Sequence, residues 1–307
     1  MAAIIESVAT SVSRRRFWPK GALRLADDAV AECLDRAHRR APELDLLINA
    51  GLYRENNLAE PALASMIQED VGANPGHPPA ESSHGTFSFD VANGGCGVLT
   101  ALDLVDGFAR SGTIDLGAVV ASDSDPGNAE SFPFPDAGGA VLLRAGVSGG
   151  GFQSFDFSTF PEFLDCFESV IAWHPAEHPG RLSAPGENVL EIRCRDDYAV
   201  RALDCADCAA RRFLAAHGLA PRDVDLLVGS ASPGTFLGDL ARRLEVPLSR
   251  VAVPDAHFAG AHTAGVIASL DVAARAGQLF TAKHVLLVTV GAGITVASAL
   301  YSHPGSG

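Results

Sequence analysis

A cysteine set among glycines is the residue of this sequence best suited to covalent chemistry. Cys96 follows Gly94 and Gly95 and precedes Gly97, where an extended segment is expected to become a helix. The free N–H groups and the dipole at a helix N-terminus lower the pKa of a thiol, and the thiolate is the nucleophile. A small cysteine packed in the core is the other interpretation, and it is common for free cysteines. Both interpretations are open at this point.

Two spacings typical of metal sites are better explained without a metal. Cys205 and Cys208 form a C-x-x-C pair within a predicted helix, whereas structural zinc pairs normally lie on turns. His174 and His178 have H-x3-H spacing, but we expect them in a proline-rich loop where no helix aligns them. We therefore expect no metal site and no bound cofactor.

The elements that would position Cys96 occur twice in the chain. "ELDLLINAG" matches "DVDLLVGSA", "GVLTALDLVDGFARSG" matches "GVIASLDVAARAG", and "GGAVLL" has a weaker counterpart in "ASALYS". The three matches follow the same order, which indicates an internal duplication. The matched segments begin at positions 43, 97 and 138 in the first copy and at 223, 265 and 297 in the second.

Each copy predicts the same succession of elements. An amphipathic helix (residues 25–38 and 198–217) precedes a strand, a further strand, a long apolar helix and two buried strands. Apolar strands alternating with helices indicate an α/β protein whose sheets are covered on both faces. Helices that are apolar around most of their circumference belong between layers. We therefore expect a five-layered α/β/α/β/α sandwich of two similar halves, residues 1–150 and 151–307.

Composition and charge exclude several classes of function. The chain has 307 residues, 47% of them hydrophobic, and a formal charge of −14 at pH 7. This acidic balance argues against nucleic-acid binding, and no apolar run approaches the ~20 residues of a membrane helix. The N-terminus lacks the pattern of a secretory signal. Six cysteines without such a signal predict reduced thiols in the cytoplasm.

Five stretches of the chain match the pattern of a known family: "FSFDVANGGCGVLTAL", "FPFPDAGGAVLL", "DLLVGSASPGTFLGDLARRL", "AHFAGAHTAGVIASL" and "VLLVTVGAGITVASALY". They resemble the thiolase superfamily, and most closely β-ketoacyl-acyl-carrier-protein synthase III and its relatives in secondary metabolism. The likeness covers about residues 25–301 and is most specific at its end. The resemblance implies a cysteine that takes an acyl group from a thioester, with His and Asn donors that stabilise an enolate.

The catalytic residues that this resemblance implies are displaced or replaced. Strict register puts Gly95 at the nucleophile position and Cys96 one residue late, Ser230 at the histidine position and Gly260 at the asparagine position. A Gly-Gly pair before the helix can absorb the slip, so that Cys96 still faces the cavity, or the nucleophile is lost. Ser230 can donate a hydrogen bond but cannot act unaided as a base.

Two histidines flank Gly260 and are candidates for the missing base. His262 precedes the second apolar helix as Cys96 precedes the first, so the internal twofold would bring the two together; a capping or packed histidine is the alternative. His257 is the reserve candidate. The main-chain N–H groups of Cys96 and Gly293 would form the oxyanion hole.

Two hypotheses for function follow. The first is a ketosynthase III-like acyltransferase or condensing enzyme of a specialised bacterial pathway, in fatty acid or polyketide biosynthesis, that forms an acyl-enzyme at Cys96. Its substrate would be an acyl thioester of coenzyme A or of the phosphopantetheine of an acyl carrier protein. The stretch "SRRRFWPKGALRL" lacks the Gly-Ile-x-x-Arg loop of relatives that use coenzyme A, which argues against tight coenzyme A binding.

The second hypothesis is an inactive pseudo-ketosynthase that pairs with an active homologue or only binds an acyl chain. In both cases we expect a dimer, either a homodimer or a heterodimer with a second ketosynthase III-like chain. The strand in "TFSFDV" would pair across the twofold axis.

Overall fold

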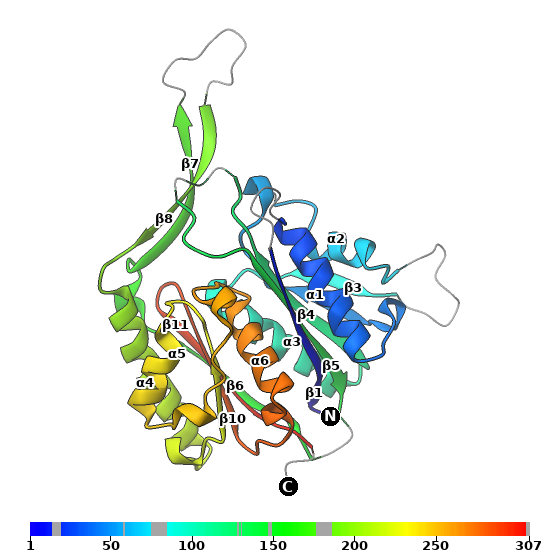
Figure 1. Cartoon of the computed structure of the whole chain (residues 1–307), viewed down its shortest axis with the longest axis vertical. Coiled ribbons are helices and arrows are strands. Elements are labelled where there is room, and N and C mark those ends of the chain that lie inside the picture. Colours follow the sequence, from blue (N-terminus) through cyan, green and yellow to red (C-terminus); the bar gives the residue numbers. More distant parts are fainter. Residues whose placement is uncertain are drawn as a thin grey trace.

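The computed structural model contains two packed β-sheets, helices on and between them, and a protruding two-stranded arm (Figure 1). His178 and the N-terminal segment 14–19, both considered above, lie outside the described residues. The described residues are 1–13, 20–57, 59–74, 85–127, 129, 131–146, 149–175 and 186–304.

The first sheet has its five strands in the order β1-β5-β4-β2-β3. β2 runs parallel to β3 and β4, whereas β5 is antiparallel to both β4 and β1. β4 is buried along its whole length, as expected of a strand covered on both faces. The bounds are β1 (Ala3–Val12), β2 (Leu46–Asn49), β3 (Phe87–Asp90), β4 (Leu116–Asp123) and β5 (Ala137–Ala145).

The second sheet has four strands in the order β6-β11-β10-β9. β9 is parallel to β10, and β11 is antiparallel to both β10 and β6. β9 thus corresponds to β2, β10 to β4, β11 to β5 and β6 to β1. The bounds are β6 (Gly151–Thr159), β9 (Leu226–Gly229), β10 (Val285–Gly291) and β11 (Thr295–Ser302).

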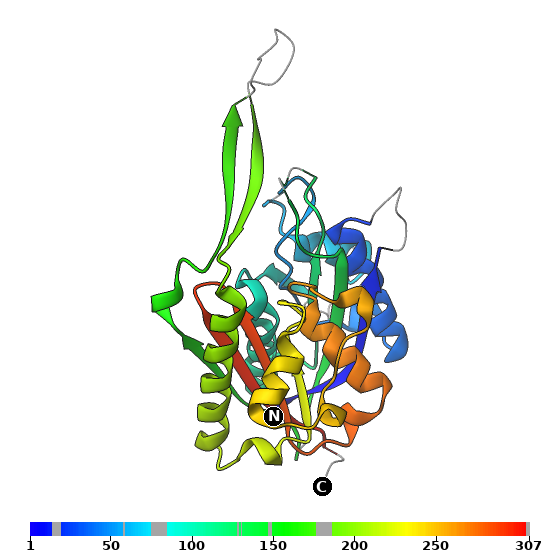
Figure 2. The same cartoon turned by 60° about the vertical axis from the view of Figure 1, so that its left-hand side comes forward.

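The helices make the other three layers (Figures 1 and 2). α1 (Ala22–Arg36) and α2 (Leu63–Asp70) cover the outer face of the first sheet, and α4 (Tyr198–Ala216) and α5 (Phe236–Leu244) cover that of the second. α3 (Gly97–Ser111) and α6 (Gly265–Arg275) lie between the sheets within one apolar core. The five-layered sandwich predicted from the sequence is confirmed. None of the described helices is long and apolar enough to cross a membrane.

The arm was not expected from the sequence. β7 (Phe167–Pro175) and β8 (Gly186–Cys194) form an antiparallel pair between β6 and α4, and the pair extends away from the body of the molecule (Figure 2). The expectation of a loop at His174 was therefore wrong. His174 lies in β7, and its Nε2 is 2.8 Å from Oε1 of Glu191 on β8.

Candidate functional site

The glycine-rich loop before α3 packs against the second sheet and fixes the direction of Cys96. Gly94–Cys96 forms a single 3₁₀ turn, and α3 begins at the next residue. The Cys96 side chain is 0% exposed, and its Sγ lies 3.3 Å from the carbonyl oxygen of Thr295 and 3.8 Å from that of Thr289. The sulfur therefore points between β10 and β11. Within the described part of the chain, no imidazole is among its polar partners.

The electrostatic environment of this thiol is the reverse of the one expected at a helix N-terminus. Burial raises the pKa of Cys96 to about 11, and the surrounding hydrogen bonds lower it only in part. Desolvation of the thiolate is the larger effect, and hydrogen bonds from the Thr289 side chain and from the main chain of Ala297 and Gly291 lower the pKa only in part. At neutral pH Cys96 is a thiol, not a thiolate.

Gly95, the residue in strict register with the family nucleophile, lies where a side chain has no room. A Cβ atom built on Gly95 would come within 2.1 Å of the carbonyl oxygen of Val290 on β10. Main-chain atoms of a buried strand cannot yield as a flexible side chain can. This close approach of loop and strand requires glycine at position 95.

Ser230 and Gly260 both take part in hydrogen bonds with main-chain groups of neighbouring segments. Ser230 directly follows β9 and is 4% exposed, and its Oγ accepts a hydrogen bond from the main-chain N–H of Val290 at 3.2 Å. Gly260 has φ +80°, a conformation that favours glycine, and its N–H donates to the carbonyl oxygen of Ala231 at 3.0 Å. Ser230 thus joins β9 to β10, and position 260 carries no side chain.

His262 lies in an aromatic cluster at the start of α6. Its ring centroid is 4.6 Å from that of Phe134 and 5.2 Å from that of Tyr53. Nδ1 is buried without a hydrogen-bond partner and lies 3.8 Å from Oδ2 of Asp123. Burial lowers the pKa of the imidazole, and the carboxylate of Asp123 opposes this only in part. His262 is therefore a neutral, largely enclosed imidazole.

The remaining candidates are His257, Gly293 and the main-chain N–H of Cys96. His257 is exposed, in a 3₁₀ turn before α6. Gly293 occupies the turn between β10 and β11 with φ +92°. The N–H of Cys96, expected in an oxyanion hole, donates to the carbonyl oxygen of Asn93 at 3.0 Å. In this conformation that N–H group is engaged within its own loop.

Asp123, at the end of β4, is the residue that joins the two halves here, and sequence reasoning missed it. Its Oδ1 accepts hydrogen bonds from the N–H groups of Leu52 (3.0 Å) and Tyr53 (2.9 Å). Its Oδ2 accepts from the N–H and the hydroxyl of Thr263, at 2.9 and 2.5 Å. A carboxylate following a buried strand, in "VVASDSD", was the available signal. Its partners are too distant in the sequence to be recognised from it.

Taken together, the structure brings His262 to Asp123 and the aromatic rings of Tyr53 and Phe134, and leaves the thiol of Cys96 in a separate environment of main-chain carbonyls. The imidazole of His262 can hold or release one proton. The thiol of Cys96 is not among the hydrogen-bond partners of this imidazole in the described structure.

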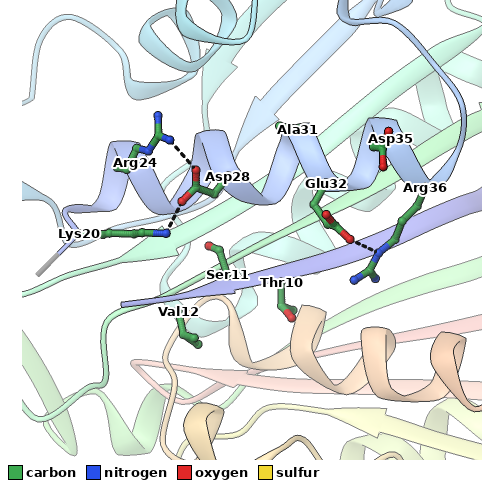
Figure 3. Close-up of a pocket in the computed structure, with 10 residues that line it drawn as sticks. All are labelled: Thr10, Ser11, Val12, Lys20, Arg24, Asp28, Ala31, Glu32, Asp35 and Arg36. Carbon is green, nitrogen blue, oxygen red and sulfur yellow. Dashed lines mark hydrogen bonds and ion pairs between the residues drawn. The ribbon is translucent and has the colours of Figure 1, made fainter. Parts of the chain in front are cut away.

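A polar cavity of about 1040 Å³ lies elsewhere, between β1 and the exposed side of α1 (Figure 3). Its cations are paired with carboxylates of the same region. Lys20 bonds to Asp28 at 2.5 Å, Arg24 lies 3.1 Å from Asp28, and Arg36 lies 2.8 Å from Glu32. Because these charges are already matched, the cavity has the character of a solvated ion-pair network and not of a site for an anionic ligand.

Comparison with known proteins agrees with this architecture. Residues 214–303 match the family described as 3-oxoacyl-[acyl-carrier-protein] synthase III C terminal. The β-ketoacyl-acyl-carrier-protein synthase III of Bordetella petrii is 28% identical over 301 residues, covering 95% of this chain and 85% of that protein. The enzyme of the same name from Alkalilimnicola ehrlichii is 26% identical over 294 residues, covering 94% and 86%.

Solved structures show the same fold at lower identity. The 3-oxoacyl-acyl-carrier-protein synthase III of Aquifex aeolicus superposes with a TM-score of 0.77 at 18% identity, covering 98% of this chain and 100% of that one. The priming β-ketosynthase of the R1128 polyketide pathway gives 0.77 at 19% identity, covering 98% and 96%. With the motifs and the duplicated five-layer architecture, these likenesses support the resemblance of the chain to the ketosynthase III-like proteins of the thiolase superfamily.

Proposed function

We propose that this chain is a catalytically silent ketosynthase III-like subunit that pairs with an active homologue. The observation that carries the proposal is the contact between Gly95 and β10. The position that holds the nucleophile in the family motif is a glycine, and its Cβ would overlap the Val290 carbonyl oxygen at 2.1 Å. The packing of the loop against β10 therefore leaves no room for a side chain at position 95.

The neighbouring cysteine does not replace that nucleophile in the present conformation. Its sulfur is fully buried, it contacts two carbonyl oxygens, and burial raises its pKa to about 11. A thiol in this state is a poor nucleophile at neutral pH. Ser230 and Gly260, at the positions of the family's His and Asn, add neither a base nor an enolate-stabilising amide.

The rival proposal is acyl transfer or condensation through Cys96 with His262 as base. One observation favours it: His262 is a neutral imidazole whose Nδ1 has no hydrogen-bond partner, next to the carboxylate of Asp123. The rival requires the loop carrying Cys96 to open, so that the sulfur leaves β10 and β11. Its acyl donor would be a thioester of an acyl carrier protein or of coenzyme A, in a specialised bacterial pathway.

A paired state is supported by exposed apolar side chains on one side of the sandwich. β3 and β6 are edge strands of the two sheets, and α3, which contacts β6, lies between the sheets. Phe87 on β3 is 58% exposed, and Leu104 on α3 and Phe157 on β6 are 38% and 39% exposed. An edge strand flanked by apolar side chains is suited to pairing with a second chain.

Intact-mass spectrometry separates the two proposals. The full chain and its Cys96→Ala variant are incubated with acyl-coenzyme A and with acyl-pantetheine thioesters at pH 7.5. The silent subunit acquires no acyl adduct under either donor. An adduct that is present in the parent chain and absent in Cys96→Ala establishes the acyltransferase and rejects the silent subunit.

Pairing is tested separately by size-exclusion chromatography with light scattering. The chain is co-expressed with a ketosynthase III homologue that retains cysteine at the position equivalent to Gly95. We expect a stable pair, and dissociation of that pair by Phe87→Asp on the β3 edge. A chain that stays monomeric with such homologues contradicts the proposed subunit role.

A further inference from the structure

The arm formed by β7 and β8 exposes large apolar side chains. Trp173, toward the outer end of β7, is 56% exposed, and Ile171, at the middle of the strand, is 53% exposed. The arm stands clear of the sandwich in both views (Figures 1 and 2). Exposed tryptophan and isoleucine side chains on a projecting element are typical of a contact surface and not of a solvated loop.

The two faces of the arm differ in chemistry. Side chains alternate between faces along a strand, so Ile171 and Trp173 share one face with Leu190, which is opposite Ile171 on β8. The other, charged face carries Glu191, which bonds to His174 at 2.8 Å and to Arg193 at 2.5 Å, beside Val170, which is 42% exposed. These three polar side chains are paired with one another, whereas Ile171 and Trp173 on the apolar face are left to be covered.

The base of the arm is anchored, so the apolar face has a defined position. Phe167 packs against Tyr198 of α4 with ring centroids 5.5 Å apart, and Leu190 bridges to Ala129 of the first half. Beyond this base, an isolated two-stranded ribbon is only marginally stable in water. Covering its apolar face removes that exposed area from water and holds the ribbon in place.

The second chain of the pair is the occupant that fits this face. β3 has four residues and spans about 14 Å, so a β3–β3 contact alone falls short of the roughly 1,200 Å² that a stable interface buries. Exposed apolar side chains continue from Phe157 at the edge strand β6 through Leu164, 72% exposed, which directly precedes the arm in the chain. The arm thus extends from the same edge that would receive the partner.

We propose that the apolar face of the β7–β8 arm, centred on Ile171 and Trp173, grips the second ketosynthase III-like chain of the pair. This inference rests on the proposed subunit role and adds to it the surface that secures the partner. Trp173 becomes covered by the partner chain when the pair forms, while the charged face of the arm stays in solvent.

The burial of Trp173 can be observed directly. The chain has two tryptophans, so Trp18→Phe leaves Trp173 as the only one. This variant is labelled with 5-fluorotryptophan and mixed with the unlabelled homologue used above. We expect the fluorine resonance to shift with a stoichiometric end point and the solvent-induced isotope shift to decrease. A pair that forms while the resonance and its isotope shift stay unchanged overturns the inference and leaves the subunit role intact.

A double variant of the arm tests how much its apolar face contributes to the affinity of the pair. Ile171→Ser with Trp173→Ser is expected to weaken the pair at least tenfold, whereas the matched control Leu248→Ser, a residue 64% exposed on a 3₁₀ turn of the body, leaves it unchanged. Circular dichroism and the thermal midpoint report whether each variant folds, and the fluorine measurement needs neither variant. Equal affinities of the arm variant and the control overturn the inference.

Two further outcomes identify a different occupant. A fluorine shift with phosphatidylglycerol vesicles, and none with the homologue, assigns the arm to a lipid surface and overturns the inference. Failure of any pair to form contradicts the subunit role as well as the inference. Acyl adducts at Cys96 in the mass spectrum would then show that the chain is an acyltransferase.

Discussion

The carboxylate of Asp123 accepts hydrogen bonds from both the main-chain N–H and the hydroxyl of Thr263, at 2.9 and 2.5 Å. Asp123 ends β4 in the first half, and Thr263 stands just before α6 in the second. The other oxygen of the same carboxylate holds the loop after β2. One buried side chain therefore fixes the relative position of three segments around His262.

Removing this carboxylate is expected to be strongly destabilising. Asp123→Ala leaves buried N–H groups without acceptors, so we expect the free energy of unfolding to fall by about 3 kcal/mol or more. Urea unfolding followed by circular dichroism measures the change. Asp125→Ala is the control, because Asp125 is exposed and bonds within its own loop, to the N–H of Gly127. Similar losses in the two variants would contradict the role assigned to Asp123.

The buried state of Cys96 predicts slow modification. With its pKa raised to about 11, only about one thiol in a thousand is ionised at pH 8, and the sulfur is also inaccessible. We expect iodoacetamide to alkylate Cys96 at least 100-fold more slowly than the exposed Cys208, and at equal rates in urea. Peptide mass spectrometry over a time course gives both rates. Equal rates in the native protein would indicate that the loop opens and would favour the acyltransferase.

A carboxyl group on α1 predicts how stability varies with pH. Burial and the nearby carboxylates of Asp70 and Asp28 raise the pKa of Asp27 from 3.8 to about 7, and its Oδ1 is buried without a partner. The folded state thus favours the protonated form, and stability is lost as pH rises from about 4 through about 7. We expect Asp27→Asn to be more stable than the parent chain at pH 8, by at least about 1 kcal/mol.

The comparison across pH supplies the control for that substitution. The difference between Asp27→Asn and the parent chain should grow between pH 4 and 7 and level off above, as measured by unfolding in urea at each pH. A difference that is constant from pH 4 to 8 would show that the asparagine acts through packing and not through the missing charge.

The sequence predicted the duplicated sandwich because the repeated segments are buried. β2 and β9 have every residue buried, and α3 and α6 are apolar over much of their surface, so their composition is constrained locally. The expected helices at 25–38 and 198–217 became α1 and α4, with ends within three residues of the expected bounds. Local patterns of this kind can be recognised in the sequence without knowing which residues lie opposite them in the core.

The direction of Cys96 and the existence of the arm could not be predicted in the same way. Whether the sulfur faces a cavity depends on how the Gly94–Cys96 turn meets β10, a contact between residues nearly 200 positions apart. β7 reads "FESVIAWHP", in which apolar residues do not alternate regularly and a proline ends the strand. β7 pairs with β8, which follows a proline-rich stretch of the sequence. This pairing depends on tertiary contacts, and these override the weak local signal.

Restoring a cysteine at the family position is the most direct test of why the nucleophile is absent. In Gly95→Cys the new Cβ would stand 2.1 Å from the Val290 carbonyl oxygen, so either the loop or β10 must shift. We expect a loss of unfolding free energy of about 1–3 kcal/mol and no acyl adduct in the mass spectrum. Gly107→Ala on α3 is the matched control, because nothing lies within 4 Å of its Cβ position, and a helical alanine should stabilise the chain by about 0.5–1 kcal/mol. A Gly95→Cys chain that is as stable as the parent and becomes acylated would mean that the loop accommodates a nucleophile, and the argument from the contact with Val290 would then be lost.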